Sequence, residues 1–145
     1  MPTLVVDSGN TRIHWRLRVA ADNSIEGYGS YENPFVDLVH ELNQLPGGLE
    51  AVAVSCLRPD LKDTLARELS MLSTPQPIWI LSGADLPKNV GTDQPGNTGA
   101  DRAMCAKAWC DRPGSHAAIV IDAGTAVTVD AVSQDGVLLG GWIAP

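Results

Sequence analysis

The sequence has few cysteines and no long apolar run. Its 145 residues include three cysteines, Cys56, Cys105 and Cys110, and no pair of them has CxxC spacing. An odd count without paired spacing argues against a disulfide framework and favours reduced thiols in the cytoplasm. No segment approaches the roughly 18–20 consecutive apolar residues of a membrane-spanning helix. The N-terminus shows no basic stretch followed by an apolar core, so we expect no signal peptide.

Positive charge is also scarce. Lys and Arg number 10 against 17 Asp and Glu, which gives a formal net charge of −7. Proteins that bind nucleic acids or anionic membranes need a positive surface field, so both functions are disfavoured. Apolar residues make up 44% of the chain, a content typical of folded globular proteins. The length allows one domain, or one domain with part of a second.

Several common binding motifs are missing. The sequence has neither GxxxxGK[ST] nor GxGxxG, which disfavours P-loop and dinucleotide-binding folds. Its three histidines, His14, His40 and His116, lack the spacing of metal ligands.

The first 31 residues predict three strands. A short β-branched run at 4–6 is followed by the turn formers of 7–11, and then apolar residues alternate with Arg or His over 12–19. Period two is typical of a strand with one buried face, so the two segments predict a hairpin. A third strand is expected at 25–31.

The periodicity then changes to that of helices. Asn33 is expected to cap a helix with Pro34 at its first position, and residues 46–48, Pro-Gly-Gly, end it. A strand is expected at 51–54, a second helix from Pro59, and a buried strand at 78–81. These elements predict an α/β fold with a mixed five-stranded sheet flanked by helices.

Residues 82–98 predict a loop of about 17 residues, rich in Gly, Pro, Asp and Asn. A loop of that length in a compact domain is usually functional or disordered. It leads to Gly99 and Ala100, where a helix is expected to begin, followed directly by Asp101 and Arg102. An Asp at this position is stabilised by the helix dipole, which is one reading. The other is that Asp101 accepts a proton from a substrate hydroxyl while Arg102 binds a carboxylate or phosphate.

A strand, an Asp-x-Gly turn and an alternating strand occur twice, about 115 residues apart. The second copy starts about 30 residues before the last residue, and a three-stranded unit without helices cannot cover its own sheet. We therefore expect a first half-domain at 1–115 and the beginning of a second at 116–145.

Both Asp-x-Gly turns offer groups that can hold phosphate. Backbone amides from Gly9 to Arg12 and the Thr11 hydroxyl could donate to phosphate oxygens, and Asp7 could hold a cation. The second copy has the same residue types at Asp122, Gly124 and Thr125. Two such loops facing each other could clamp a nucleoside triphosphate. A tight hairpin turn is the alternative for either one alone.

Four motifs follow one another in a fixed order and spacing. They are Asp7-Ser8-Gly9-Asn10-Thr11, Gly99-Ala100-Asp101-Arg102, Asp122-Ala123-Gly124-Thr125-Ala126 with Thr128 and Asp130, and Gly140-Gly141-Trp142-Ile143-Ala144-Pro145. Together they resemble the type III pantothenate kinase family of the actin-like ATPase and sugar-kinase superfamily. The resemblance implies a ribonuclease-H-like fold. It also implies phosphorylation of pantothenate by ATP to 4′-phosphopantothenate, the first step of coenzyme A synthesis.

The resemblance also implies roles for individual residues. Asp101 would be the general base, and Asp122 would help to bind a monovalent cation, potassium or ammonium. Pantothenate would contact Gly99, Ala100 and Arg102. ATP would be bound by Asp7, Ser8, Gly9, Asn10, Thr11, Arg12, Gly124 and Thr125, with Asp7 near magnesium. Two subunits of this family pair to build the pantothenate site.

Two features depart from the family pattern. Members usually run to about 250 residues, so we predict that the 145-residue chain alone is a poor or inactive kinase. The family also usually has a tyrosine where this chain has Thr92. Two other functions stay open: a non-catalytic relative acting as an accessory or binding protein, and another kinase or phosphatase of the superfamily.

Overall fold

The computed structural model describes residues 2–20 and 23–145. The chain divides into two compact units, Met1–Trp79 and Ile80–Pro145. The half-domain boundary expected after residue 115 is based on the sequence repeat and not on compactness, and it stays a prediction.

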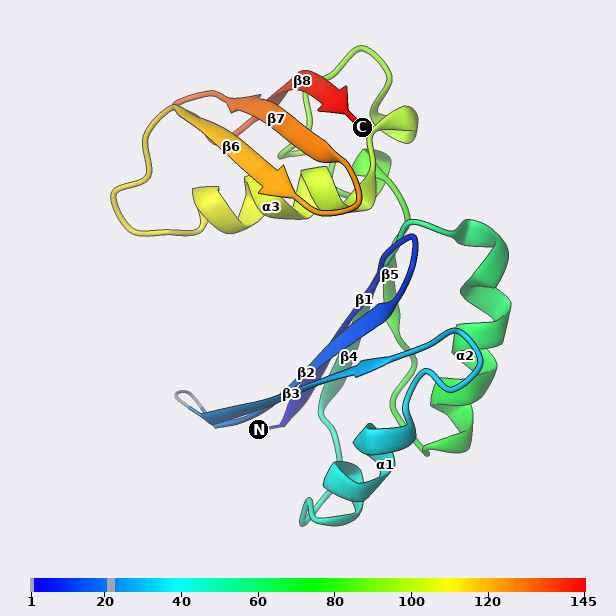
Figure 1. The fold of residues 1–145 in the computed structure, drawn as a ribbon. Helices are drawn as coiled ribbons and strands as arrows, with labels where there is room; N and C mark the ends of the chain where they lie inside the picture. The colour runs from blue at the N-terminus through cyan, green and yellow to red at the C-terminus, as the bar shows by residue number, and fades with distance from the viewer. Residues whose placement is uncertain (1, 21–22) are drawn as a thin grey trace. The chain divides into compact units, whose positions relative to one another are not determined.

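The first unit is built on a mixed five-stranded sheet. Its order is β3-β2-β1-β4-β5, with β1 antiparallel to β2 and parallel to β4 (Figure 1). The elements are β1 (Thr3–Ser8), β2 (Ile13–Ala20), β3 (Asn23–Gly29), α1 (Val36–Asn43), β4 (Ala51–Cys56), the 3-10 turn η1 (Pro59–Leu61), α2 (Lys62–Met71) and β5 (Ile78–Ile80). The predicted hairpin, the predicted mixed sheet and the helix opened by Pro59 are confirmed.

One face of this sheet is apolar because the alternating strands are paired in register. Leu4 lies opposite Leu17 on β2 and beside Val52 on β4, and all three side chains are buried. Helices α1 and α2 lie against this face (Figure 1). They bury Leu38, Leu65 and Leu69. The buried core therefore fixes the register between β1 and β2. This register pairs Ser8 with Ile13 and leaves residues 9–12 as the turn between the two strands.

Two expectations for this unit are wrong. Asn33 does not cap α1, which begins at Val36 after Phe35. The chain is instead held in a turn, since the Asn33 amide donates to the Ser30 hydroxyl at 3.1 Å and the backbone of Pro34 fills the space left by Gly29. The strand at β5 is not buried either. Ile78 is 65% exposed because β5 is the last strand of the sheet.

The second unit packs one helix against a three-stranded antiparallel meander. Its elements are the 3-10 turns η2 (Gly83–Asp85) and η3 (Pro95–Asn97), then α3 (Ala100–Cys110), β6 (Ala118–Ala123), β7 (Val127–Val132) and β8 (Leu138–Ala144). The strand order is β6-β7-β8, as the second copy of the repeat predicts. Its core joins α3 to the sheet through Val90, Ala103, Ala106, Val132 and Leu138.

The segment at 82–98 is an ordered part of this unit. Ser82 pairs with Gly99, and Val90 pairs with Leu138 as isolated β-bridges. Val90 is 5% exposed and belongs to the core. The segment is therefore attached at its first residue to the residue before α3 and at its middle to β8.

The alternation in β7 places polar side chains inward. Thr128 and Asp130 are buried, whereas Val127 is 37% exposed. On β6, Ile119 and Ile121 lie opposite residues of that outer face and are exposed. The inner face of β7 therefore combines buried polar side chains with Val132 of the apolar core. None of the helices within residues 2–20 and 23–145 combines the length and the apolar composition of a membrane-spanning segment.

Candidate functional site

The first predicted phosphate loop connects β1 to β2. The Gly9 amide donates to the Arg12 carbonyl at 3.1 Å, which closes the turn. The Gly9 amide is therefore already hydrogen-bonded within the protein. The backbone donors of this loop that a phosphate could still reach are those of residues 10–12. Asn10, Thr11 and Arg12 are exposed, as is Asp7 at the end of β1.

Tyr31 fixes this loop from outside. Its hydroxyl donates to the Gly9 carbonyl and lies 3.3 Å from the Ser8 hydroxyl oxygen, which is fully buried. The Leu57 amide, just beyond β4, donates to the Ser8 carbonyl at 3.0 Å. The predicted loop is thus braced by two segments far from it in sequence. No sequence motif singled out Tyr31.

The fold does not require glycine at position 9. A Cβ placed there would meet only the Arg12 carbonyl, at 3.5 Å, an ordinary contact. The same holds in the second predicted loop, where a Cβ at Gly124 would lie 3.9 Å from the Ala126 carbonyl. A glycine that internal packing does not demand is consistent with close approach of a ligand to the backbone.

The second predicted loop connects β6 to β7. The Gly124 amide donates to the Ala126 carbonyl at 3.0 Å, and Asp122 and Thr125 are exposed beside it. Each loop therefore has an exposed carboxylate and an exposed hydroxyl next to a turn closed by a glycine amide. That both loops grip one polyphosphate stays a prediction.

Asp101 and Arg102 lie in the first turn of α3, as expected. The helix begins at Ala100 after Gly99, and one oxygen of the Asp101 carboxylate accepts from the Arg102 amide at 2.8 Å. This is the contact expected of a carboxylate at a helix N-terminus. The second oxygen can still accept a proton from a ligand, so the contact is compatible with a role as base.

The Arg102 side chain pairs with Asp130 on β7. Its Nε lies 3.0 Å from both carboxylate oxygens of Asp130, and Nη2 also donates to Oδ1. The side chains are 13% and 3% exposed, respectively. Hydrogen bonding to this carboxylate raises the pKa of Arg102 above its ordinary value. The sequence contained both residues in the motifs, but no pattern indicated that they pair.

The candidate metal ligands in the described residues are isolated carboxylates and not clusters. Within residues 2–20 and 23–145, no group of three or more His, Cys, Asp or Glu side chains is placed to hold a metal ion. Magnesium in phosphoryl-transfer sites is commonly held by one or two carboxylates together with substrate phosphates. Single exposed carboxylates such as Asp7 and Asp122 fit that mode and do not form an all-protein cage.

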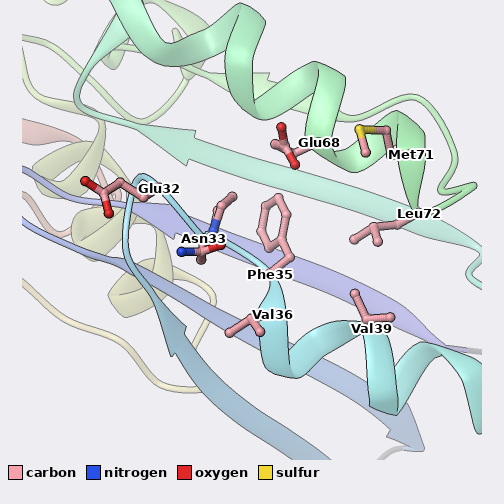
Figure 2. Close-up of a pocket in the computed structure, with 9 residues that line it drawn as sticks. Glu32, Asn33, Phe35, Val36, Val39, Glu68, Met71 and Leu72 are labelled. Atoms are coloured by element: carbon pink, nitrogen blue, oxygen red, sulfur yellow. The ribbon is translucent and has the colours of Figure 1, made fainter.

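A groove between α1 and α2 was not predicted. Its volume is about 230 Å³, and Figure 2 shows apolar side chains and two carboxylates around it. The lining residues are Glu32, Asn33, Pro34, Phe35, Val36, Val39, Glu68, Met71 and Leu72. It includes none of the residues assigned to phosphate or acceptor binding. Val39 lines this groove and is 41% exposed.

The family model and the curated relatives that match this chain have the same description. The family model described as type III pantothenate kinase matches residues 3–145. Type III pantothenate kinases of Desulfatibacillum aliphaticivorans and Nitrosospira multiformis are 32% and 34% identical over 158 and 148 aligned residues, each covering 98% of this chain. The matches cover 58% and 53% of those proteins, so the chain spans little more than half their length.

Among solved structures, an exopolyphosphatase-like protein matches 99% of this chain and 50% of its own, with a TM-score of 0.54 and 11% identity. At that identity the match supports the fold alone, and it agrees with the mixed sheet and α/β class. The family match covers nearly the whole chain, and it includes both Asp-x-Gly turns and the start of α3. The chain therefore belongs to the type III pantothenate kinase family.

Proposed function

We propose that the protein containing this chain transfers the γ-phosphoryl group of ATP to the 4′-hydroxyl of pantothenate, giving 4′-phosphopantothenate and ADP. In this reaction a bond forms between the acceptor oxygen and the γ-phosphorus. The bond from that phosphorus to the ADP oxygen breaks, and the hydroxyl proton needs an acceptor. We assign that role to Asp101.

The observation that carries the proposal is that a carboxylate and an immobilised guanidinium lie next to each other at the start of α3. Asp101 and Arg102 are adjacent, and the Arg102 guanidinium is held in place by the buried Asp130. A carboxylate beside a fixed guanidinium can bind an acceptor that has both a hydroxyl and a carboxylate, as pantothenate has. The family match supports the same acceptor.

The phosphate-binding part is assigned to the two Asp-x-Gly loops. We assign Gly9, Asn10, Thr11 and Arg12 to ATP in the first loop. Ser8, which the sequence also suggested as an ATP ligand, is fully buried, so we assign it to support of the loop instead. In the second loop we assign Gly124 and Thr125. The Gly9 amide closes the turn, so we assign Gly9 the role of letting the phosphates come close to the backbone. The backbone amides of the exposed residues 10–12 would donate to the phosphates.

The remaining assignments concern ions and partners. Asp7 would hold magnesium or its waters, and Asp122 would help to hold potassium or ammonium. A bound metal would neutralise charge that develops on the transferred phosphoryl group. Gly99 and Ala100 would contact pantothenate through the backbone. We further propose a homodimer in the cytoplasm.

Calorimetric titration of the 145-residue chain with ATP and with pantothenate, each in the presence of magnesium and potassium, tests the assignment. Turnover assayed in a version with the length of its relatives completes the test. Binding of both ligands, with phosphopantothenate as product, supports the proposal. Binding of ATP alone favours another kinase or phosphatase of the superfamily. Binding of neither favours a non-catalytic accessory protein.

A further inference from the structure

The pair formed by Asp130 and Arg102 is unusual in its surroundings. Asp130 is 2% exposed on the inner face of β7, where its strand neighbour two residues on, Val132, belongs to the apolar core. Removing a carboxylate from water is costly, and a buried ion pair often adds no stability over an apolar pair of similar volume. Stability is therefore a weak explanation for a buried carboxylate at this position. Its effect on the Arg102 side chain is a stronger one.

The contact occupies one edge of the guanidinium. The hydrogen bonds to Asp130 use Nε and Nη2. A guanidinium has five N–H donors in a planar fork, so its Nη1–Nη2 edge can still bind a second carboxylate. Asp130 thus fixes the plane and direction of the fork without using all of its donors.

The backbone of β8 makes room for this arrangement. Gly141 lies directly opposite Asp130 in the sheet, and a Cβ at Gly141 would overlap the Val129 carbonyl oxygen and lie 2.7 Å from Oδ1 of Asp130 and 2.8 Å from its Cα. Gly140 has a φ of +118°, a conformation that side-chain-bearing residues rarely adopt. Gly141 is therefore explained by close packing against Val129 and Asp130 on β7, whereas Gly140 is explained by its backbone conformation.

We propose that Asp130 is a positioning residue for acceptor recognition: it holds the Arg102 guanidinium so that its outer edge receives the carboxylate of pantothenate. This inference rests on the proposed function. A long, flexible side chain loses rotamer freedom when it binds a ligand, and holding it in advance removes part of that loss. Asp130 touches neither acceptor nor ATP in this scheme.

The test compares Asp130→Asn with Asp111→Asn in a version with the length of the relatives. Asp111 pairs with Lys107 on the same helix but at its exposed end, so it is a matched control. The acceptors are pantothenate and pantothenol, which has an alcohol in place of the carboxylate. We expect Asp130→Asn to raise KM for pantothenate about 10- to 100-fold, the range for a lost charge-assisted hydrogen bond. KM for pantothenol and for ATP should change little, as should kcat.

Each result supports or overturns a defined claim. If the wild-type protein does not phosphorylate pantothenate, the proposed function fails and this inference fails with it. If wild type is active but Asp130→Asn raises KM for both acceptors equally, or matches Asp111→Asn, only the positioning role is overturned. A loss confined to kcat or to ATP binding overturns it as well.

A second pair of variants covers the case in which Asp130→Asn does not fold. Asp130→Glu retains the charge but moves the carboxylate by one methylene, so it should raise KM for pantothenate above the wild-type value while KM for pantothenol stays unchanged. In an Arg102→Gln background, the same change should have no further effect on that KM, because the group it positions is gone. An equal effect in both backgrounds would contradict the proposal.

Discussion

The Tyr31 hydroxyl donates to the carbonyl of Gly9, so a residue just beyond β3 holds the turn between β1 and β2 in place. The same hydroxyl lies 3.3 Å from the buried Ser8 hydroxyl oxygen. The Arg58 guanidinium lies over the Tyr31 ring, 5.9 Å from its centroid. The loop proposed to bind phosphate is therefore supported by side-chain contacts as well as by its own turn.

We predict that Tyr31→Phe weakens ATP binding and lowers the free energy of unfolding by about 1 kcal/mol, the usual contribution of such a hydrogen bond. The ring and its packing remain, so the change should be confined to the loop. Tyr28→Phe is the matched control because Tyr28 lies three residues earlier, on β3, and is 57% exposed. Urea unfolding and ATP titration of both variants provide the measurement. Equal effects of the two substitutions would show that the Gly9 contact does not matter.

A second prediction separates ligand binding from folding at Gly9. Gly9→Ala should leave the melting temperature nearly unchanged, because the added Cβ would make only an ordinary 3.5 Å contact. If the loop approaches phosphate closely, ATP affinity should fall about 10-fold or more, since the Cβ would displace the ligand. Gly96→Ala is the control, as a Cβ there meets nothing within 4 Å. Unchanged ATP affinity in Gly9→Ala would remove this loop from the site.

The hairpin and the sheet could be predicted because their determinants are local. Alternation over residues 12–19 and the turn formers of 7–11 define a strand pair without any knowledge of the rest of the chain. The start of α3 at Ala100 is equally local. Asn33 misled because the backbone of Pro34 packs onto Gly29, a contact between segments that a capping preference does not include.

The part of the site that sequence reasoning missed depends on tertiary packing. Arg102 and Asp130 are 28 positions apart, and they meet only because α3 packs on β7. Tyr31 reaches Gly9 across a similar separation, on a segment without a motif. The groove between α1 and α2 likewise exists only once both helices are placed on the sheet. Residue types at fixed spacing cannot reveal such contacts.

A third prediction concerns the turn between β7 and β8. Gly136 has a φ of +79°, and a Cβ there would lie 2.7 Å from Sγ of Cys110, whose thiol donates to the Gly136 carbonyl. Gly136→Ala should therefore cost the 1–2 kcal/mol typical of a left-handed residue and, in addition, the energy of the clash, giving about 2–4 kcal/mol.

Gly114→Ala is the control for this change. Gly114 has a φ of +73°, but a Cβ there meets nothing within 4 Å, so only the backbone strain should be felt. Thermal and urea unfolding of the two variants give the difference that is due to packing on Cys110. If both lose the same stability, the contact with Cys110 adds nothing.

The central claim is that Asp101 accepts the acceptor's proton in phosphoryl transfer from ATP to pantothenate. Asp101→Asn keeps the shape of the side chain and its ability to accept from the Arg102 amide. It removes the basic oxygen, and general-base catalysis is worth about 10²- to 10⁴-fold in rate.

The most direct measurement is the rate of 4′-phosphopantothenate formation at saturating ATP and pantothenate, in a version with the length of the relatives, for wild type and Asp101→Asn. ATP affinity is titrated in parallel. We predict a fall in kcat of at least about 100-fold with ATP affinity unchanged. A rate that stays within a few-fold of wild type would contradict the account, as would a wild-type protein that forms no phosphopantothenate.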